Sequence, residues 1–287
     1  MSSSASHTTR TSDGRSVQDR YGEVCQRIRD AAKRSGRRES DIFLVAVTKY
    51  ADQEQIRTLL ELGHKDFGEN RVQNLMQRAI MVDEYLARLK VLPHGRETRS
   101  GIFTEQHRVA GASEKSVRWH MIGHVQRNKS RKIIDFVRLV HSVDSLRLAE
   151  ELQAVAVRRE MNVEVLIQVN CSGEDGKFGC PLPAVPALVD QIGTMMNVKV
   201  RGLMTMAPYS ENPEDARPIF SRCKDLFEEM QLDGVAEGRF NLLSMGMSGD
   251  YEVAISEGAN IVRVGSAIFG EPSPDHPVDV EEPEEEA

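Results

Sequence analysis

The strongest constraint on the fold is a regular alternation of apolar runs of strand length with segments of helical periodicity. IFLVAV, at 42–47, is apolar at consecutive positions, as expected when both faces of a parallel strand are covered. The segment that follows, DQEQIRTLLELG, places Ile56, Leu59 and Leu60 at helical spacing before Gly63. The pattern predicts strands at 42–49, 66–70, 118–123, 136–144, 163–170, 198–206, 240–246 and 260–266, and helices at 17–35, 52–63, 71–92, 129–134, 146–159, 181–196, 216–230 and 251–258.

Strict alternation of this kind is typical of two architectures, an open doubly wound sheet and a closed eight-stranded barrel. An open sheet that binds a dinucleotide carries a glycine-rich loop after its first strand. Here that strand ends in TKYADQ, which has no glycine. We therefore predict an α/β fold, a single (β/α)8 TIM barrel over residues 17–270, with a polar surface insertion at 93–116 and disordered tails at 1–16 and 271–287.

The formal charge of −7 is concentrated at the carboxyl end, where residues 271–287 hold eight acidic side chains and no Lys or Arg. Without these eight, 36 acidic side chains face 37 basic ones, so the barrel lacks the basic excess of a nucleic-acid-binding protein. No apolar run approaches the ~20 residues of a membrane helix. The acidic tail is expected to be self-repelling and to aid solubility.

The four cysteines form no C-x-x-C pair, which favours reduced thiols in the cytoplasm. Residues 1–16 contain no apolar segment and so do not resemble a secretory signal. They carry Ser and Arg and few acids, which leaves mitochondrial targeting as the alternative. His120 and His124 have the spacing of a metal pair on a helix, but they flank a strand end, and no metal site is predicted.

Polar residues close nearly every predicted strand, and in a barrel these ends line the one mouth that carries the chemistry. Lys49 ends the first strand. A lysine there is either a side chain reaching for water or an amine whose pKa is lowered by burial, which makes it nucleophilic. The other strand-end residues are His120, Ser142 to Asp144, Asn70, Asn170, Thr205, Ser244, Arg263, Gly265 and Ser266.

Two glycine- and serine-containing segments follow the last two strands, where barrels of this kind usually bind phosphate. SMGMSGD, at 244–250, offers Ser244 and Gly246, with Ser248 placed to cap the next helix. VRVGSAIFG, at 262–270, offers Gly265 and Ser266 after an arginine, Arg263, set in an apolar run. A buried guanidinium needs a partner, either an acidic neighbour or a cofactor ring nitrogen.

A reactive lysine on the first strand and a phosphate site on the last two together describe pyridoxal 5′-phosphate. In this interpretation the aldehyde joins Lys49 and the phosphate lies at Ser244, Gly265 and Ser266. Arg263 faces the pyridine nitrogen, which then stays unprotonated and is a weaker electron sink.

Eight segments in order resemble the pyridoxal phosphate homeostasis family, which is related to the N-terminal barrel of alanine racemase. They are LVAVTKY, FGENRVQ, WHMIGHVQRNK, HSVDS, VLIQVN, RGLMTMAP, LSMGMSGD and VRVGSAIFG. The resemblance implies an internal aldimine on Lys49, Arg263 beside the ring nitrogen, Ser244, Gly246, Gly265 and Ser266 around the phosphate, and Asn70 lining the pocket. It also implies a monomer or weak dimer that supplies cofactor to pyridoxal-phosphate-dependent apoenzymes.

We expect a cofactor carrier without catalytic residues, because the chain ends after Gly270 and the acidic tail, with no room for the second domain of the racemases. A racemase or decarboxylase of narrow scope is the first alternative. A Schiff-base aldolase without a cofactor, which would be colourless, is the second. A binding module that acts only through its acidic tail is the third.

Overall fold

Eight parallel strands form a closed barrel, as the sequence predicts. The computed structural model describes residues 14–91, 117–174 and 178–271; the expected insertion, and the expected tails apart from residues 14–16 and 271, lie outside it. The strands are β1 (Phe43–Val47), β2 (Asp66–Glu69), β3 (Arg118–Met121), β4 (Val137–Val143), β5 (Val163–Asn170), β7 (Val198–Met204), β8 (Leu242–Ser244) and β9 (Ile261–Val264). The parallel pairing of β9 with β1 and of β4 with β5 closes the ring.

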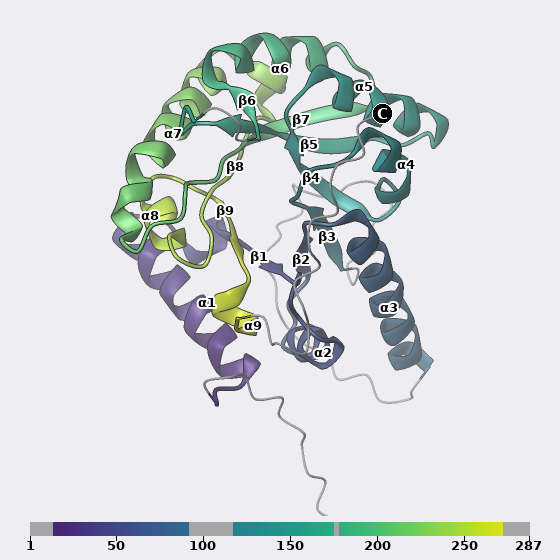
Figure 1. Ribbon diagram of the computed structural model, residues 1–287, viewed down its shortest axis with the longest axis vertical. Helices are drawn as coiled ribbons and strands as arrows, with labels where there is room; N and C mark the ends of the chain where they lie inside the picture. The colour runs from purple at the N-terminus through teal and green to yellow at the C-terminus, as the bar shows by residue number, and fades with distance from the viewer. Residues whose placement is uncertain (1–13, 92–116, 175–177, 272–287) are drawn as a thin grey trace, which may run out of the picture.

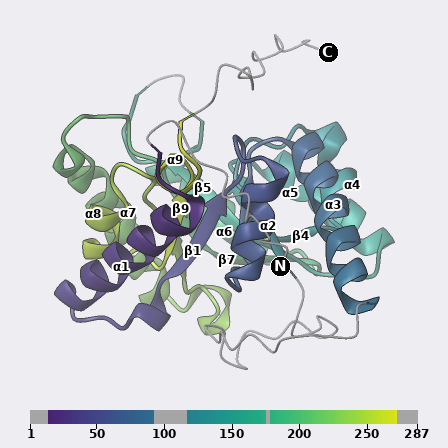
Figure 2. The same ribbon diagram turned by 90° about the horizontal axis from the view of Figure 1, so that it is seen from below.

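Helices surround the strands on the outside of the ring (Figures 1 and 2). They are α1 (Val17–Arg34), α2 (Gln53–Glu61), α3 (Val72–Val91), α4 (Ser130–Ile133), α5 (Leu146–Arg158), α6 (Val185–Gly193), α7 (Arg217–Leu232), α8 (Tyr251–Ser256) and α9 (Ser266–Phe269). The sequence missed α9 and the two-residue strand β6 (Cys180–Pro181), which pairs with the end of β5. Both are too short to show a period.

Two apolar layers hold the barrel together. The interior of the ring is filled by side chains that alternate with outward-facing ones along each strand. They are Val45, Leu139, Leu166, Met204, Leu242 and Ile261. The larger layer lies between the strands and the surrounding helices, and includes Phe67, Trp119 and Phe220.

The amino-terminal helix α1 lies outside the strand–helix alternation and packs against α8 and α9, which end the barrel (Figure 1). Ser16 caps it, with Asp19 completing a capping box, so the helix begins where the sequence predicts. Arg27 and Arg34 both pair with Glu252 of α8. The first helix thus holds the last strand–helix unit in place.

Over the described ranges, no helix combines the length and apolar character that crossing a bilayer requires.

Candidate functional site at the carboxyl ends of the strands

Lys49 lies in a tight turn at the carboxyl end of β1. The N–H of Ala51 donates to the carbonyl of Thr48 at 2.8 Å, so Lys49 and Tyr50 form the tip of the turn. The Lys49 side chain is exposed, and its Nζ lies 4.6 Å from the centroid of the Tyr50 ring. Of the two alternatives that the sequence left open for Lys49, the structure shows the exposed side chain and not the buried amine. The lysine lies over the ring of Tyr50.

The last loop lies directly beside this turn, because β1 and β9 are adjacent. Val45 pairs with Arg263 and Ala46 with Val264. A Cβ on Gly265 would lie 3.2 Å from the carbonyl oxygen of Val47. Glycine at this position lets the last loop approach the first strand two residues before Lys49.

Arg263 points into the barrel and is only 3% exposed. Its Nη1 donates to the Ser244 hydroxyl at 2.6 Å and its Nη2 to the Thr205 carbonyl at 2.9 Å. Burial lowers the pKa of Arg263 to about 10, although Asp250 and Cys223 act in the opposite direction. No carboxylate in the described part of the chain forms an ion pair with it; Asp250, the acidic neighbour, acts on it only at longer range.

The loop after β8 contains a glycine in a left-handed conformation. Gly246 has φ +91°, and a Cβ there would lie 2.6 Å from the Cβ of Ala254. Ser248 does not cap α8, contrary to the sequence prediction. Its hydroxyl instead accepts the N–H of Gly265 at 3.1 Å and that of Ala267 at 3.3 Å. The two loops predicted to bind phosphate are therefore joined to each other.

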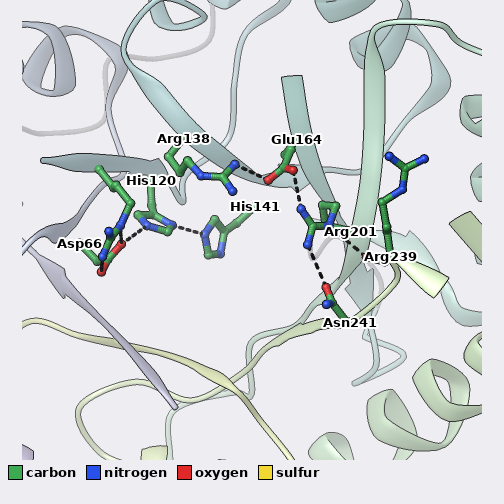
Figure 3. A network of polar contacts seen from close by, with 9 residues as sticks. Asp66, His120, Arg138, His141, Glu164, Arg201, Arg239 and Asn241 are labelled. Carbon is green, nitrogen blue, oxygen red and sulfur yellow. Dashed lines mark hydrogen bonds and ion pairs between the residues drawn. The ribbon is translucent and has the colours of Figure 1, made fainter. Parts of the chain in front are cut away.

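Ser244 begins a row of polar side chains that crosses the barrel interior. It is fully buried, and its hydroxyl lies 3.0 Å from Nδ1 of His141. Nε2 of His141 lies 3.0 Å from Nδ1 of His120, and Nε2 of His120 lies 3.1 Å from Asp66 (Figure 3). With Arg263 at its other end, this row, the polar relay, joins β9 to β2 through β8, β4 and β3.

The donor and acceptor of each hydrogen bond in the polar relay follow from the Asp66 carboxylate at one end, when both imidazoles are neutral. An ionised Asp66 only accepts, so Nε2 of His120 donates to it. In a neutral imidazole the other nitrogen accepts, so His141 donates to His120 through Nε2 and accepts at Nδ1. The Ser244 hydroxyl must then donate to His141, which leaves its lone pairs for the Arg263 N–H.

Charges around the relay support this assignment. Burial lowers the pKa of His141 well below its usual value, and the positive charge of Arg263 acts in the same direction, as a proton on His120 would. Burial alone would raise the pKa of Asp66, but hydrogen bonds from Arg118 and His120 outweigh it and hold the pKa below its ordinary range. Arg118 binds both carboxylate oxygens of Asp66, at 2.6 and 2.5 Å.

A second polar cluster lies near the amino ends of the strands, away from Lys49. Glu164 of β5 pairs with Arg138 of β4 and Arg201 of β7, and Arg201 also donates to Asn241 at 3.1 Å (Figure 3). Because barrel chemistry belongs to the carboxyl end of the strands, we interpret this cluster as structural.

Asn70 and His124 lie apart from the polar relay. Asn70 is exposed just after β2. His124 is half-exposed and stacks on Phe178, with ring centroids 5.2 Å apart, while His120 lies inside the barrel. Among the residues that the structure describes, no cluster of His, Cys, Asp or Glu could hold a metal ion.

Sequence reasoning missed His141 and Asp66, and it considered His120 as a strand-end residue and as half of a metal pair, not as part of a relay. His120 and His141 each stand inside a strand between two buried neighbours, whereas Asp66 opens its strand. An isolated polar residue within an apolar strand is the signal that identifies the two histidines, because a buried polar group requires a partner.

These residues fit the cofactor implied by the resemblance. A buried cation without a carboxylate partner favours an anionic or hydrogen-bond-accepting ligand. A primary amine, that of Lys49, lies exposed in the turn that follows the adjacent strand β1. Glycine at 246 and at 265 leaves these two positions of the loops without a side chain.

Comparisons with known proteins agree with this chemistry. The chain matches the family model described as the alanine racemase N-terminal domain over residues 25–273. A protein of Aquifex aeolicus named pyridoxal phosphate homeostasis protein is 37% identical over 257 residues, covering 88% of this chain and 97% of the relative.

Solved structures with a similar fold include a relative of the same kind and an alanine racemase. PipY of Synechococcus elongatus PCC7942, determined with PLP bound, is similar with a TM-score of 0.66 and 28% identity, over 88% of this chain and 100% of that one. An alanine racemase of Clostridium difficile 630 shares the fold with a TM-score of 0.58 and 14% identity, over 91% of this chain and 59% of the racemase.

Proposed function

The chain belongs to the alanine racemase N-terminal domain family, and from that membership we propose that it is a pyridoxal 5′-phosphate-binding homeostasis protein that holds the cofactor on Lys49. The observation that carries the proposal is Arg263, a buried guanidinium without a carboxylate partner in the described residues, on the strand next to that of Lys49. A relative determined with the cofactor bound and relatives named for its homeostasis support it.

In this proposal the covalent step is reversible and conserves atoms. Lys49 would hold the cofactor through its aldehyde, in a condensation that releases one water. Arg263 donates toward the ring nitrogen, Ser244 orients Arg263, and Gly246, Gly265 and Ser266 surround the phosphate. Asn70 lines the side of the site opposite β9. The chain thereby keeps a reactive aldehyde out of solution.

The absorption spectrum of the freshly purified protein tests this proposal. We expect a visible imine band that borohydride removes, with the added mass on the peptide that contains Lys49. Lys49→Ala should lack the band. A colourless wild-type protein that stays colourless with added pyridoxal 5′-phosphate would exclude the carrier and favour the aldolase.

Amino-acid racemisation is the second candidate function, because racemases share the barrel. The carrier proposal predicts that the loaded protein does not exchange the α-proton of alanine with solvent deuterium at a rate above that of free cofactor. Rapid exchange, lost in Lys49→Ala, would establish an enzyme instead. Delivery to apoenzymes, a cytoplasmic location and a monomer or weak dimer remain parts of the proposal.

Tyr50 is expected to weaken cofactor capture slightly. Its ring holds the free Lys49 ammonium, a contact of about 0.5–1 kcal/mol at an exposed site. Tyr50→Leu should therefore tighten the apparent Kd for pyridoxal 5′-phosphate about twofold to fivefold, measured by titration of the imine band. Tyr50→Phe keeps the ring and serves as the control; weaker capture in both variants would show that Tyr50 contacts the cofactor.

A further inference from the structure

The turn that carries Lys49 is held at both ends by side chains of the neighbouring strand and helix. At its first residue, the Thr48 hydroxyl hydrogen-bonds to Glu69 of β2, and the Thr48 N–H donates to the Gly68 carbonyl at 3.0 Å. At its last residue, the Ala51 carbonyl accepts Nη2 of Arg78 at 3.1 Å. The tip of the turn lies between two fixed points.

Glu69 and Arg78 also bind each other, so the two fixed points form one unit. Nη1 of Arg78, on α3, donates to Oε1 of Glu69 at 2.5 Å, the same oxygen that Thr48 reaches. Glu69 is fully buried and Arg78 is mostly buried, with 18% of its side chain exposed. Burial raises the pKa of Glu69, and Arg78 opposes this shift.

We propose that the Glu69–Arg78 pair is a positioning device for Lys49, which sets how readily the amine reaches a bound aldehyde. The inference deepens the proposed function and rests on it. Neither side chain contacts the Lys49 amine or the aldehyde; both act through Thr48 and Ala51, the two ends of the turn.

The physical reason lies in the entropy of the turn. Once the cofactor is bound, imine formation is intramolecular, and its equilibrium depends on how often the amine occupies the productive position. A turn fixed at both ends loses little further freedom on reaction. A turn released at one end samples other conformations, and the fraction with Lys49 directed at the aldehyde falls.

A purely structural ion pair is the competing explanation, and the contacts count against it. A buried pair is weak evidence for stability by itself. Here the fork of Arg78 is divided between Glu69 and the Ala51 carbonyl, so the pair is joined to both ends of the Lys49 turn. By contrast, Arg138 and Glu164 form a similar pair that contacts no part of this turn.

Two variants release one end of the turn each. Thr48→Val keeps the shape of the side chain and removes the hydroxyl that reaches Glu69. Arg78→Lys keeps the positive charge, but an ammonium lacks the planar fork that reaches Glu69 and the Ala51 carbonyl together. Arg138→Met is the matched control, because it breaks a partly buried ion pair at the other end of the barrel.

Two ligands separate imine formation from binding of the ring and phosphate. Pyridoxal 5′-phosphate is titrated by its visible imine band. The second ligand is the analogue with a methyl group in place of the aldehyde, 4′-deoxypyridoxine 5′-phosphate, which binds without reacting and is measured by calorimetry. Chemical denaturation of the cofactor-free variants gives their stability.

We expect the apparent Kd for pyridoxal 5′-phosphate to rise about tenfold in Thr48→Val and in Arg78→Lys, since positioning dominates intramolecular reactions. The Kd for the analogue should stay within about twofold of wild type, and Arg138→Met should change neither. Equal losses for both ligands, or no loss for either, would overturn the inference. A wild-type protein that binds the analogue but never forms an imine would overturn the proposed role of Lys49 instead.

Discussion

Replacing Arg263 by methionine is expected to weaken pyridoxal 5′-phosphate binding by about a hundredfold, because a hydrogen bond to a charged group contributes about 1.5–3 kcal/mol. The cofactor-free protein should lose little stability. Methionine fills much of the same volume, and the change removes a buried guanidinium that forms no ion pair with a carboxylate of the described residues. When both are measured on the same variant, the cofactor affinity should fall and the free energy of unfolding should stay close to that of wild type.

Arg263→Lys separates charge from geometry at the same position. Lysine keeps a cation near Ser244 but cannot also reach the Thr205 carbonyl as the guanidinium does. We expect an intermediate affinity and an imine band shifted from that of wild type. If methionine and wild type retain the cofactor equally on dialysis, Arg263 does not contact it.

From the sequence, Ser244→Asp is expected to weaken cofactor binding by repelling the phosphate. The structure predicts a different cause for the same loss. The serine hydroxyl lies 2.6 Å from the Arg263 guanidinium, so an aspartate would pair with that cation. The substitution then acts by neutralising Arg263 rather than by direct repulsion at the phosphate loops.

Acid is expected to destabilise the cofactor-free protein steeply below about pH 6.5. Burial lowers the pKa of both His141 and His64 from the usual 6.5. Below that pH, His141 and His64 each bind a proton in the unfolded chain but stay neutral in the folded chain. The free energy of unfolding therefore falls as pH falls. Each such histidine contributes about 1.4 kcal/mol per pH unit until its folded-state pKa is reached.

The groups that face these histidines reinforce the trend at lower pH. Asp66, whose pKa is held low by Arg118 and His120, contributes stability above its unfolded pKa and loses it as pH falls toward its folded one. Denaturation midpoints at pH 7.5, 6.5 and 5.5 measure the slope directly.

His141→Gln tests the assignment within the polar relay. A glutamine amide can accept from Ser244 and donate to His120 without titrating. About half of the slope between pH 6.5 and 5.5 should disappear in this variant. His124→Gln changes a half-exposed ring outside the relay and should leave the slope as it is; an unchanged slope in His141→Gln would refute the assignment.

The fold follows from the sequence because its signals are local and repeated. Most strands lie in apolar runs, and each long helix shows its period, so the order of elements was enough to select a barrel. The elements that the sequence did not predict, α9 and β6, are too short to show a periodic pattern. The wrong role for Ser248 has a different cause: a serine near a helix start commonly caps it, but here two N–H groups from the last loop compete successfully.

The site was only partly predictable for the same reason. Lys49 and Arg263 stand out as charges at the ends of apolar strands, and the adjacency of β1 and β9 in a barrel brings them together. The polar relay depends on which inward-facing positions come together across five strands. The pairing register decides this, and a single sequence does not display it. Glu69 and Arg78 act on the turn from outside the ring, so their relation to Lys49 appears only in three dimensions.

The contact of α1 with α8 has a consequence for synthesis on the ribosome. Arg27 and its partner Glu252 are 225 residues apart. At about 5–20 residues per second, the first helix waits roughly 10 to 45 s before its partner has been made. During that interval Val24 and Ile28, buried in the finished protein, have no α8 or α9 to cover them. We therefore expect the amino end of the nascent chain to expose these apolar side chains until the barrel can close.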